Sequence, residues 1–221
     1  MSEVTITVRG EHEARLAPEL AVARVSVRVD GPERAAVAAR ATELSMALRE
    51  ELQAHQDAGA LARWSSDRVS IWSDRPWSQD GAQLPLVHHA TVGARGEFTD
   101  FAALSDWVTR LGDREGVTVE GIDWKLTPDT ARQTERDVAA GAVRVAVERA
   151  EAYASAIGLG GVAPLEIADV GLLAQPGEAP RPQARMFAMA ADSAGSSGPS
   201  LQFEPQPIIV TAAVEARFSA R

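Results

Sequence analysis

The chain has 221 residues, of which 45% are hydrophobic, and its formal net charge is −9. This length and composition predict a globular protein with a packed core and exclude wholesale disorder. A net negative charge without a basic cluster disfavours binding to nucleic acid or to an anionic membrane surface. Because the chain has no cysteine, disulfides, thiolate nucleophiles and Cys-ligated metal sites are excluded.

The first third of the chain predicts two strands and a helix. Apolar and polar residues alternate over residues 4–8 and again over residues 21–29. A polar segment at residues 11–19 separates them, so we expect an antiparallel hairpin. Gly31 and Pro32 end the second strand and open a helix over residues 32–57. Its apolar stripe consists of Val37, Ala41, Leu44, Leu48 and Leu52, at helical spacing.

The middle third predicts two more strands, a second helix and a fifth strand. The two strands cover residues 62–74 and 86–98, and a loop at residues 75–85 with two prolines and a glycine joins them. Thr99 or Asp100 can cap a helix that ends near Gly112. Its buried stripe is expected to contain Phe101, Leu104, Trp107, Val108 and Leu111. A strand follows at residues 117–126.

The last third begins with a long helix. Thr127 suits the N-cap, Pro128 the first helical position, and Gly158 and Gly160 offer stops. Small residues on this helix predict close packing against a sheet, through Ala139, Ala142, Ala146 and Ala150. A strand is expected at residues 164–173 and a final one at residues 208–218. Between them, residues 174–200 are rich in Pro, Gly, Ala and Ser, and we expect this segment to be mobile.

The element order is therefore β-β-α-β-β-α-β-α-β-β. Strand pairs joined by short turns predict an α+β fold with mainly antiparallel sheets and with helices packed on one face. The alternation of helix and strand after Thr99 also allows local parallel pairing. We expect one domain over residues 1–221, and two sheet-plus-helix lobes within it are also compatible with the pattern.

Four stretches resemble the SIMPL-domain family, a bacterial group of unknown function. They are I-T-V-R-G-E-H-E-A-R-L-A-P-E-L-A from Ile6, G-V-T-V-E-G-I-D-W-K-L-T from Gly116, the helix and Gly-rich turn over residues 135–162, and F-E-P-Q-P-I-I-V-T-A-A-V-E-A-R-F from Phe203. One departure is Gln206, which stands where the family often has Gly. The resemblance implies a role in stress tolerance or envelope physiology and assembly into large oligomers, and it supplies no catalytic residues.

Candidate catalytic and metal-binding residues are few. His88 and His89 are adjacent, so in a strand they point to opposite faces and cannot easily share a metal. We expect one exposed and one packed imidazole. Asp129, Glu135 and Asp137 lie at the start of the long helix, where the helix dipole alone favours acidic residues. No nucleophile elbow or phosphate-binding loop is present. The sequence therefore predicts no catalytic site, no cofactor and no metal.

Candidate interaction residues are apolar side chains in or beside loops. Trp72 and Trp77 flank the Pro-containing loop, and Met186, Phe187 and Met189 lie inside the segment expected to be mobile. Exposed aromatic residues favour protein–protein contact.

We therefore expect a non-enzymatic protein that self-assembles into a homo-oligomer. Two alternatives stay open: a small-molecule-binding protein or hydrolase with a cleft between helices and sheet, and a cytoplasmic adaptor for another protein. The N-terminus shows no signal-peptide pattern, and the sequence has no apolar run of about 18 residues. The protein is thus expected in the cytoplasm without a membrane span, whereas most relatives are periplasmic or envelope-associated.

Overall fold

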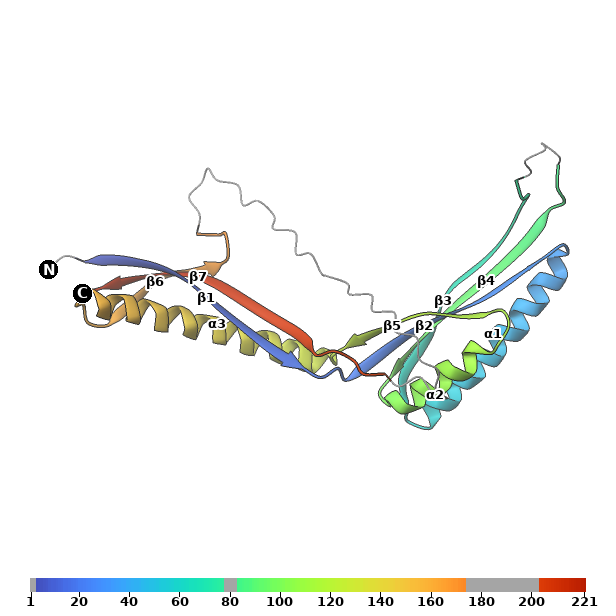
Figure 1. The fold of residues 1–221 in the computed structure, drawn as a ribbon, viewed down its shortest axis with the longest axis horizontal. Coiled ribbons are helices and arrows are strands. Elements are labelled where there is room, and N and C mark those ends of the chain that lie inside the picture. The colour runs from blue at the N-terminus through green and yellow to red at the C-terminus, as the bar shows by residue number, and fades with distance from the viewer. Residues whose placement is uncertain (1–2, 78–82, 174–202) are drawn as a thin grey trace. The chain divides into compact units, whose positions relative to one another are not determined.

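The computed structural model describes residues 3–77, 83–173 and 203–221 (Figure 1). The elements in these ranges follow the predicted order, and each sheet is antiparallel throughout. The α+β class is thus confirmed, and the parallel pairing that the pattern also allowed does not occur in these ranges. The elements are β1 (Val4–Leu16), β2 (Leu20–Gly31), α1 (Arg34–Asp57), β3 (Leu61–Asp74), β4 (Val87–Phe98), α2 (Phe101–Gly112), β5 (Val117–Lys125), α3 (Pro128–Ala156), β6 (Val162–Asp169) and β7 (Ile208–Ala220).

The chain divides into two compact units, each with its own sheet. One unit comprises Met1–Ala17, Thr127–Gly195 and Pro207–Arg221, and its sheet has the order β1-β7-β6. The other comprises Pro18–Leu126 and Ser196–Gln206, with the order β3-β4-β2-β5. Residues 174–200, which we expected to be mobile, lie outside the described residues.

The predicted hairpin between the first two strands is wrong. β1 pairs along its whole length with β7, from Val4 opposite Ala220 to Leu16 opposite Ile208. The polar segment predicted as a turn mostly continues this strand, because its alternation persists: Glu11, Glu13 and Arg15 alternate with smaller or less charged residues. A strand with one wet face can be polar over a long stretch, so local polarity did not reveal the strand's end.

Helix α3 lies along β1 and β7 in the first unit (Figure 1). Its caps are as predicted: the Thr127 hydroxyl accepts from the amide of Thr130 at 3.3 Å, and Gly158 has φ of +76°. Gly10 of β1 permits a close approach, because a Cβ there would lie 2.6 Å from the amide nitrogen of Ala146. The strand and helix backbones are therefore almost in contact at this point.

The small-residue face of α3 is confirmed with one correction. Ala142, Ala146 and Ala150 are fully buried, whereas Ala139 is exposed. The buried row instead runs at steps of mainly four residues and winds around the helix, as packing against a twisted sheet requires. Its members are Thr134, Val138, Gly141, Ala142, Ala146, Ala150 and Ala154.

Both helices of the second unit cover one face of the four-stranded sheet. The predicted stripe of α1 is confirmed in full, and that of α2 differs only in that Phe101 is half-buried and Ser105 is buried. Asp100 is the residue that caps α2, since its carboxylate accepts from the amides of Ala102 and Ala103. The core between helices and sheet centres on Leu48, Leu52, Phe98, Leu104, Trp107 and Leu111.

Strand β6 is shorter than the predicted strand at residues 164–173. It ends at Asp169, and Gly171 follows with φ of +88°, a conformation that favours glycine and interrupts an extended chain. The Gly171 amide donates to Glu215 of β7 at 3.1 Å, which fixes this turn. No helix within the described ranges is long and apolar enough to cross a membrane.

Candidate functional site

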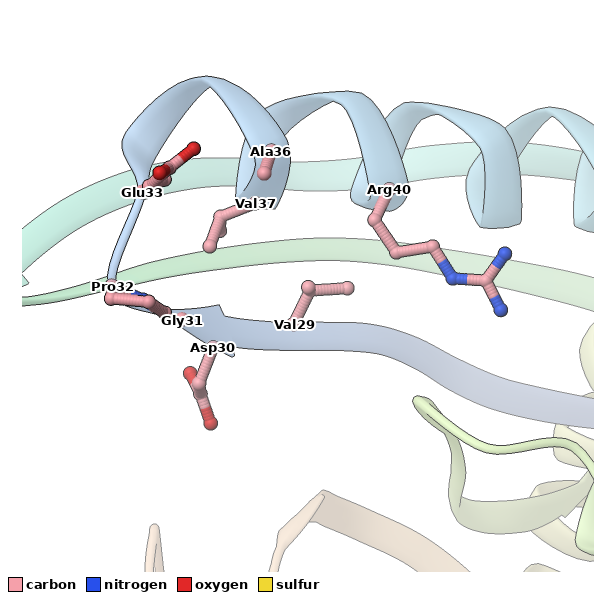
Figure 2. A pocket seen from close by; sticks show the side chains of 8 residues that line it. All are labelled: Val29, Asp30, Gly31, Pro32, Glu33, Ala36, Val37 and Arg40. Carbon is pink, nitrogen blue, oxygen red and sulfur yellow. The ribbon is translucent and has the colours of Figure 1, made fainter.

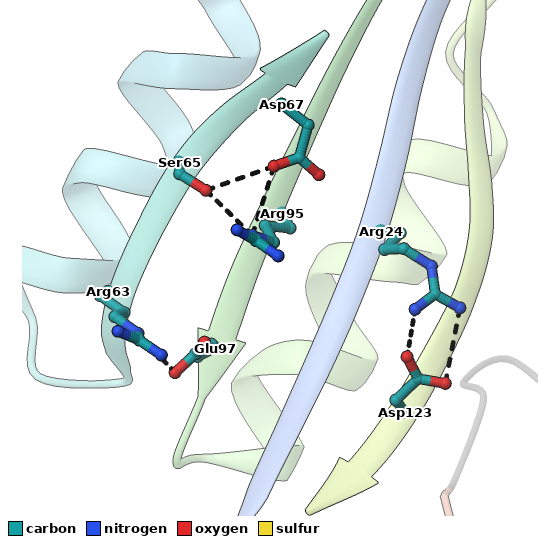
Figure 3. Close-up of polar contacts among 7 residues, drawn as sticks. All are labelled: Arg24, Arg63, Ser65, Asp67, Arg95, Glu97 and Asp123. Atoms are coloured by element: carbon teal, nitrogen blue, oxygen red, sulfur yellow. Dashed lines mark hydrogen bonds and ion pairs between the residues drawn. The ribbon is translucent and has the colours of Figure 1, made fainter.

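The face of the four-stranded sheet that points away from α1 and α2 carries paired charges (Figure 3). Alternation along the strands places these side chains opposite the core. Arg24 of β2 pairs with Asp123 of β5, and Arg63 of β3 donates to Glu97 of β4 at 2.7 Å. The hydrogen bond from Arg63 lowers the pKa of Glu97.

Arg95 of β4 completes the arrangement, because it donates to the Ser65 hydroxyl at 3.1 Å and lies 3.3 Å from the carboxylate of Asp67 (Figure 3). Each of the arginines drawn in this view therefore has a carboxylate beside it. Carboxylates thus balance the positive charges that Figure 3 draws on this face. These residues do not provide the excess positive charge that binding of an anion or nucleic acid would need.

The same face ends in a cluster around His89. This residue lies on β4, opposite Asp30 on β2 and Trp72 on β3. Its Nδ1 atom is 2.6 Å from Asp30, and its Nε2 atom is 3.1 Å from Asp74 at the end of β3. The imidazole stacks on the Trp72 indole, with ring centroids 5.0 Å apart and planes inclined by 16°. Three strands thus contribute side chains to one cluster.

His88 belongs to a separate contact. Its Nδ1 atom lies 2.6 Å from the hydroxyl of Ser73, which is its partner in the register between β3 and β4. The two histidines thus have separate partners, and both are half-buried, so the expected contrast between one exposed and one packed ring is wrong. A serine–histidine pair needs a third group to orient the ring and donors for an oxyanion, and the hydrogen bonds of the described residues show neither for His88.

The remaining titratable candidates do not converge. Asp129 pairs with Arg132, Asp137 accepts from Gln133 at 3.0 Å, and Glu135 is exposed. Each is thus a surface residue of α3. Over the part of the chain that the structure describes, no three His, Asp or Glu side chains are placed as ligands of one metal ion.

A hollow of about 310 Å³ lies between the end of β2 and the start of α1 (Figure 2). Its lining includes Val29 and Val37, and Pro32 lies at one end. Figure 2 shows the carboxylate of Asp30 directed away from the helix. This carboxylate contacts His89, and Glu33 is exposed. Because its ionisable groups point in different directions, the hollow lacks the convergent polar groups of a binding pocket.

The predicted interaction residues divide into two groups. Trp72 has 46% of its surface exposed and Trp77 has 82%. Met186, Phe187 and Met189 lie outside the described residues. Two further apolar residues near Trp72 were not singled out from the sequence, Val69 at 68% and Ile71 at 44% exposed. Only the sheet order reveals their significance, since it places β3 at an edge.

Comparison with known proteins gives one family. Residues 6–218 match the family model SIMPL, described as a protein of unknown function (DUF541). No curated protein matches the chain.

Proposed function

Because this chain belongs to the SIMPL (DUF541) family, whose function is unknown, we propose a function from its own geometry: the protein self-assembles by pairing the β3 edge with the β3 edge of a second copy. The observation that carries the proposal is a run of exposed apolar side chains on an edge strand. Val69, Ile71 and Trp72 lie within four consecutive positions of β3.

An edge strand presents backbone N–H and C=O groups on its outer side, and these can pair with another strand. Proteins often blunt such edges with charge, proline or bulges. β3 has a register shift between Ser66 and Val69 but pairs regularly with β4 from Val69 to Asp74. The segment from Val69 to Asp74 pairs regularly and also carries the exposed apolar side chains. No bulge interrupts this segment, so it is free to pair with another strand.

The edge is also self-complementary in an antiparallel register centred on Ile71. In that register Ile71 faces its own copy, Ser70 faces the partner's Trp72, and Arg68 faces the partner's Asp74. Opposite charges that face each other across strands stabilise pairing, and apolar pairs add to it. The second copy thus places its Ile71 against Ile71 at the centre, and opposite charges face each other at the ends.

Sedimentation equilibrium over a range of protein concentrations tests this proposal. We expect wild-type protein to show an association equilibrium, and Ile71→Lys to weaken it by about tenfold or more, which corresponds to about 1.4 kcal/mol. The reason is that two lysines would face each other at the centre of the interface.

The matched control is Ile209→Lys on β7, because Ile209 is 54% exposed but belongs to the other unit, where it lies opposite Arg15 of β1. This variant should associate like the wild type. A monomeric wild type at every concentration, or equal effects of the two lysines, would contradict pairing through β3.

A further inference from the structure

We propose that Asp30, His89 and Asp74 form a pH-dependent cluster, here called the latch, which holds the end of β3 against β4 and β2. Trp72 stacks on the imidazole of His89 in this cluster. This inference goes beyond self-assembly, because every group in the latch belongs to one chain.

The contacts of His89 define its charge state. Both ring nitrogens lie within hydrogen-bond distance of a carboxylate, at 2.6 Å from Asp30 and 3.1 Å from Asp74. A carboxylate only accepts, so both nitrogens must donate, and only the imidazolium carries two N–H groups. The closed latch therefore contains protonated His89. Stacking on Trp72 favours the same form, since an indole face attracts a cation.

Among the residues that the structure describes, the charged groups that act on His89 are both acidic. They come from β3 and β2 and are Asp74 and Asp30. Arg28, the next residue on this face of β2, is paired with Glu120 of β5. Hydrogen bonds to Asp74 and Asp30 accordingly raise the pKa of His89 above its ordinary value.

Deprotonation releases one carboxylate. A neutral imidazole keeps a single N–H, and the shorter contact, between Nδ1 and Asp30, retains it. Nε2 then faces the carboxylate of Asp74 with a lone pair, and the contact becomes repulsive. Asp74 is the last residue of β3. The end of β3 is thus freed, and Trp72 loses its cationic partner.

The sign of the pH dependence follows from the raised pKa. A histidine with a higher pKa in the folded than in the unfolded state contributes stability that is fully present below its pKa in the unfolded chain, about 6.5. That contribution to stability is lost as the pH rises through the pKa of His89 in the folded protein. The latch is therefore closed in mildly acidic solution and opens toward alkaline pH.

NMR titration of the full chain tests the latch. The ring protons of His89 should titrate above about 6.5, and Asp74→Asn should lower that midpoint. Protection factors of the amides of residues 72–74 should fall by about tenfold or more as the pH passes the His89 midpoint, because the end of β3 opens locally.

Two variants separate the latch from a general loss of structure. His89→Gln cannot titrate, so the protection of residues 72–74 should be low and independent of pH, while the circular dichroism stays that of the folded protein. His88→Gln is the matched control and should keep the wild-type profile. A His89 midpoint at or below about 6.5, or a wild-type profile in His89→Gln, would overturn the proposal. Both readouts are taken at low protein concentration, so a failure of self-association leaves them interpretable.

Discussion

Because α3 packs closely on its sheet, we predict that a larger side chain at Ala146 destabilises the folded protein. Its side chain is fully buried, and it lies over Gly10, where even a methyl group would come within 2.9 Å of the Ala146 Cβ. Leucine at position 146 adds three carbons at a point where strand and helix almost touch. Overpacking of a filled core costs about 1–3 kcal/mol, and the lack of space over Gly10 places Ala146→Leu at the upper end of this range.

The same substitution at Ala139 provides the control. Ala139 lies on the same helix but is exposed, so Ala139→Leu should change the free energy of unfolding by no more than about 0.5 kcal/mol. The pair thus compares identical chemistry on two faces of one helix.

Urea unfolding followed by two signals measures the effect. Helix α3 lies in the unit that contains Thr127–Gly195. All five tryptophans lie in the other unit, and they are Trp64, Trp72, Trp77, Trp107 and Trp124. The loss of helical circular dichroism should therefore move to lower urea in Ala146→Leu, and it should do so by more than the tryptophan signal moves. Equal unfolding of the two leucine variants would refute the packing described for this face.

Two further predictions concern the other unit. Removing the cap of α2 by Asp100→Ala should destabilise by about 1 kcal/mol, because two amides of the first turn lose their acceptor; urea unfolding followed by tryptophan fluorescence measures it, and Asp106→Ala on the exposed face of α2 should have little effect. Burial beside Phe98 and Trp107, followed by the charge of Arg110, lowers the pKa of His55. As the pH decreases, His55 therefore binds a proton in the unfolded chain before it does so in the folded protein. The stability should fall as the pH decreases below about 6.5, the ordinary pKa of histidine, toward the lower pKa of His55 in the folded protein. In His55→Gln that part of the pH dependence should disappear, and an unchanged profile would contradict the assignment.

The sequence by itself determined the order of elements, the helices and the caps of α3, because helices and caps depend on neighbours within about one helical turn. Thr127, Pro128 and Gly158 fix the ends of α3 through local hydrogen bonds and backbone preferences. The stripe of α1 could likewise be read residue by residue, since one face of a helix repeats every three or four positions.

The tertiary structure alone decided which strands that are distant in sequence are neighbours. Polarity does not specify a distant partner, and for this reason the pairing of β1 with β7 was not predictable from the alternation in either strand. The cluster around His89 has the same origin: Asp30, Trp72 and Asp74 are far from it in sequence and meet it only because β2 and β3 flank β4. The edge position of β3, and with it the exposure of Val69 and Ile71, likewise follows from sheet order, which long-range backbone pairing sets.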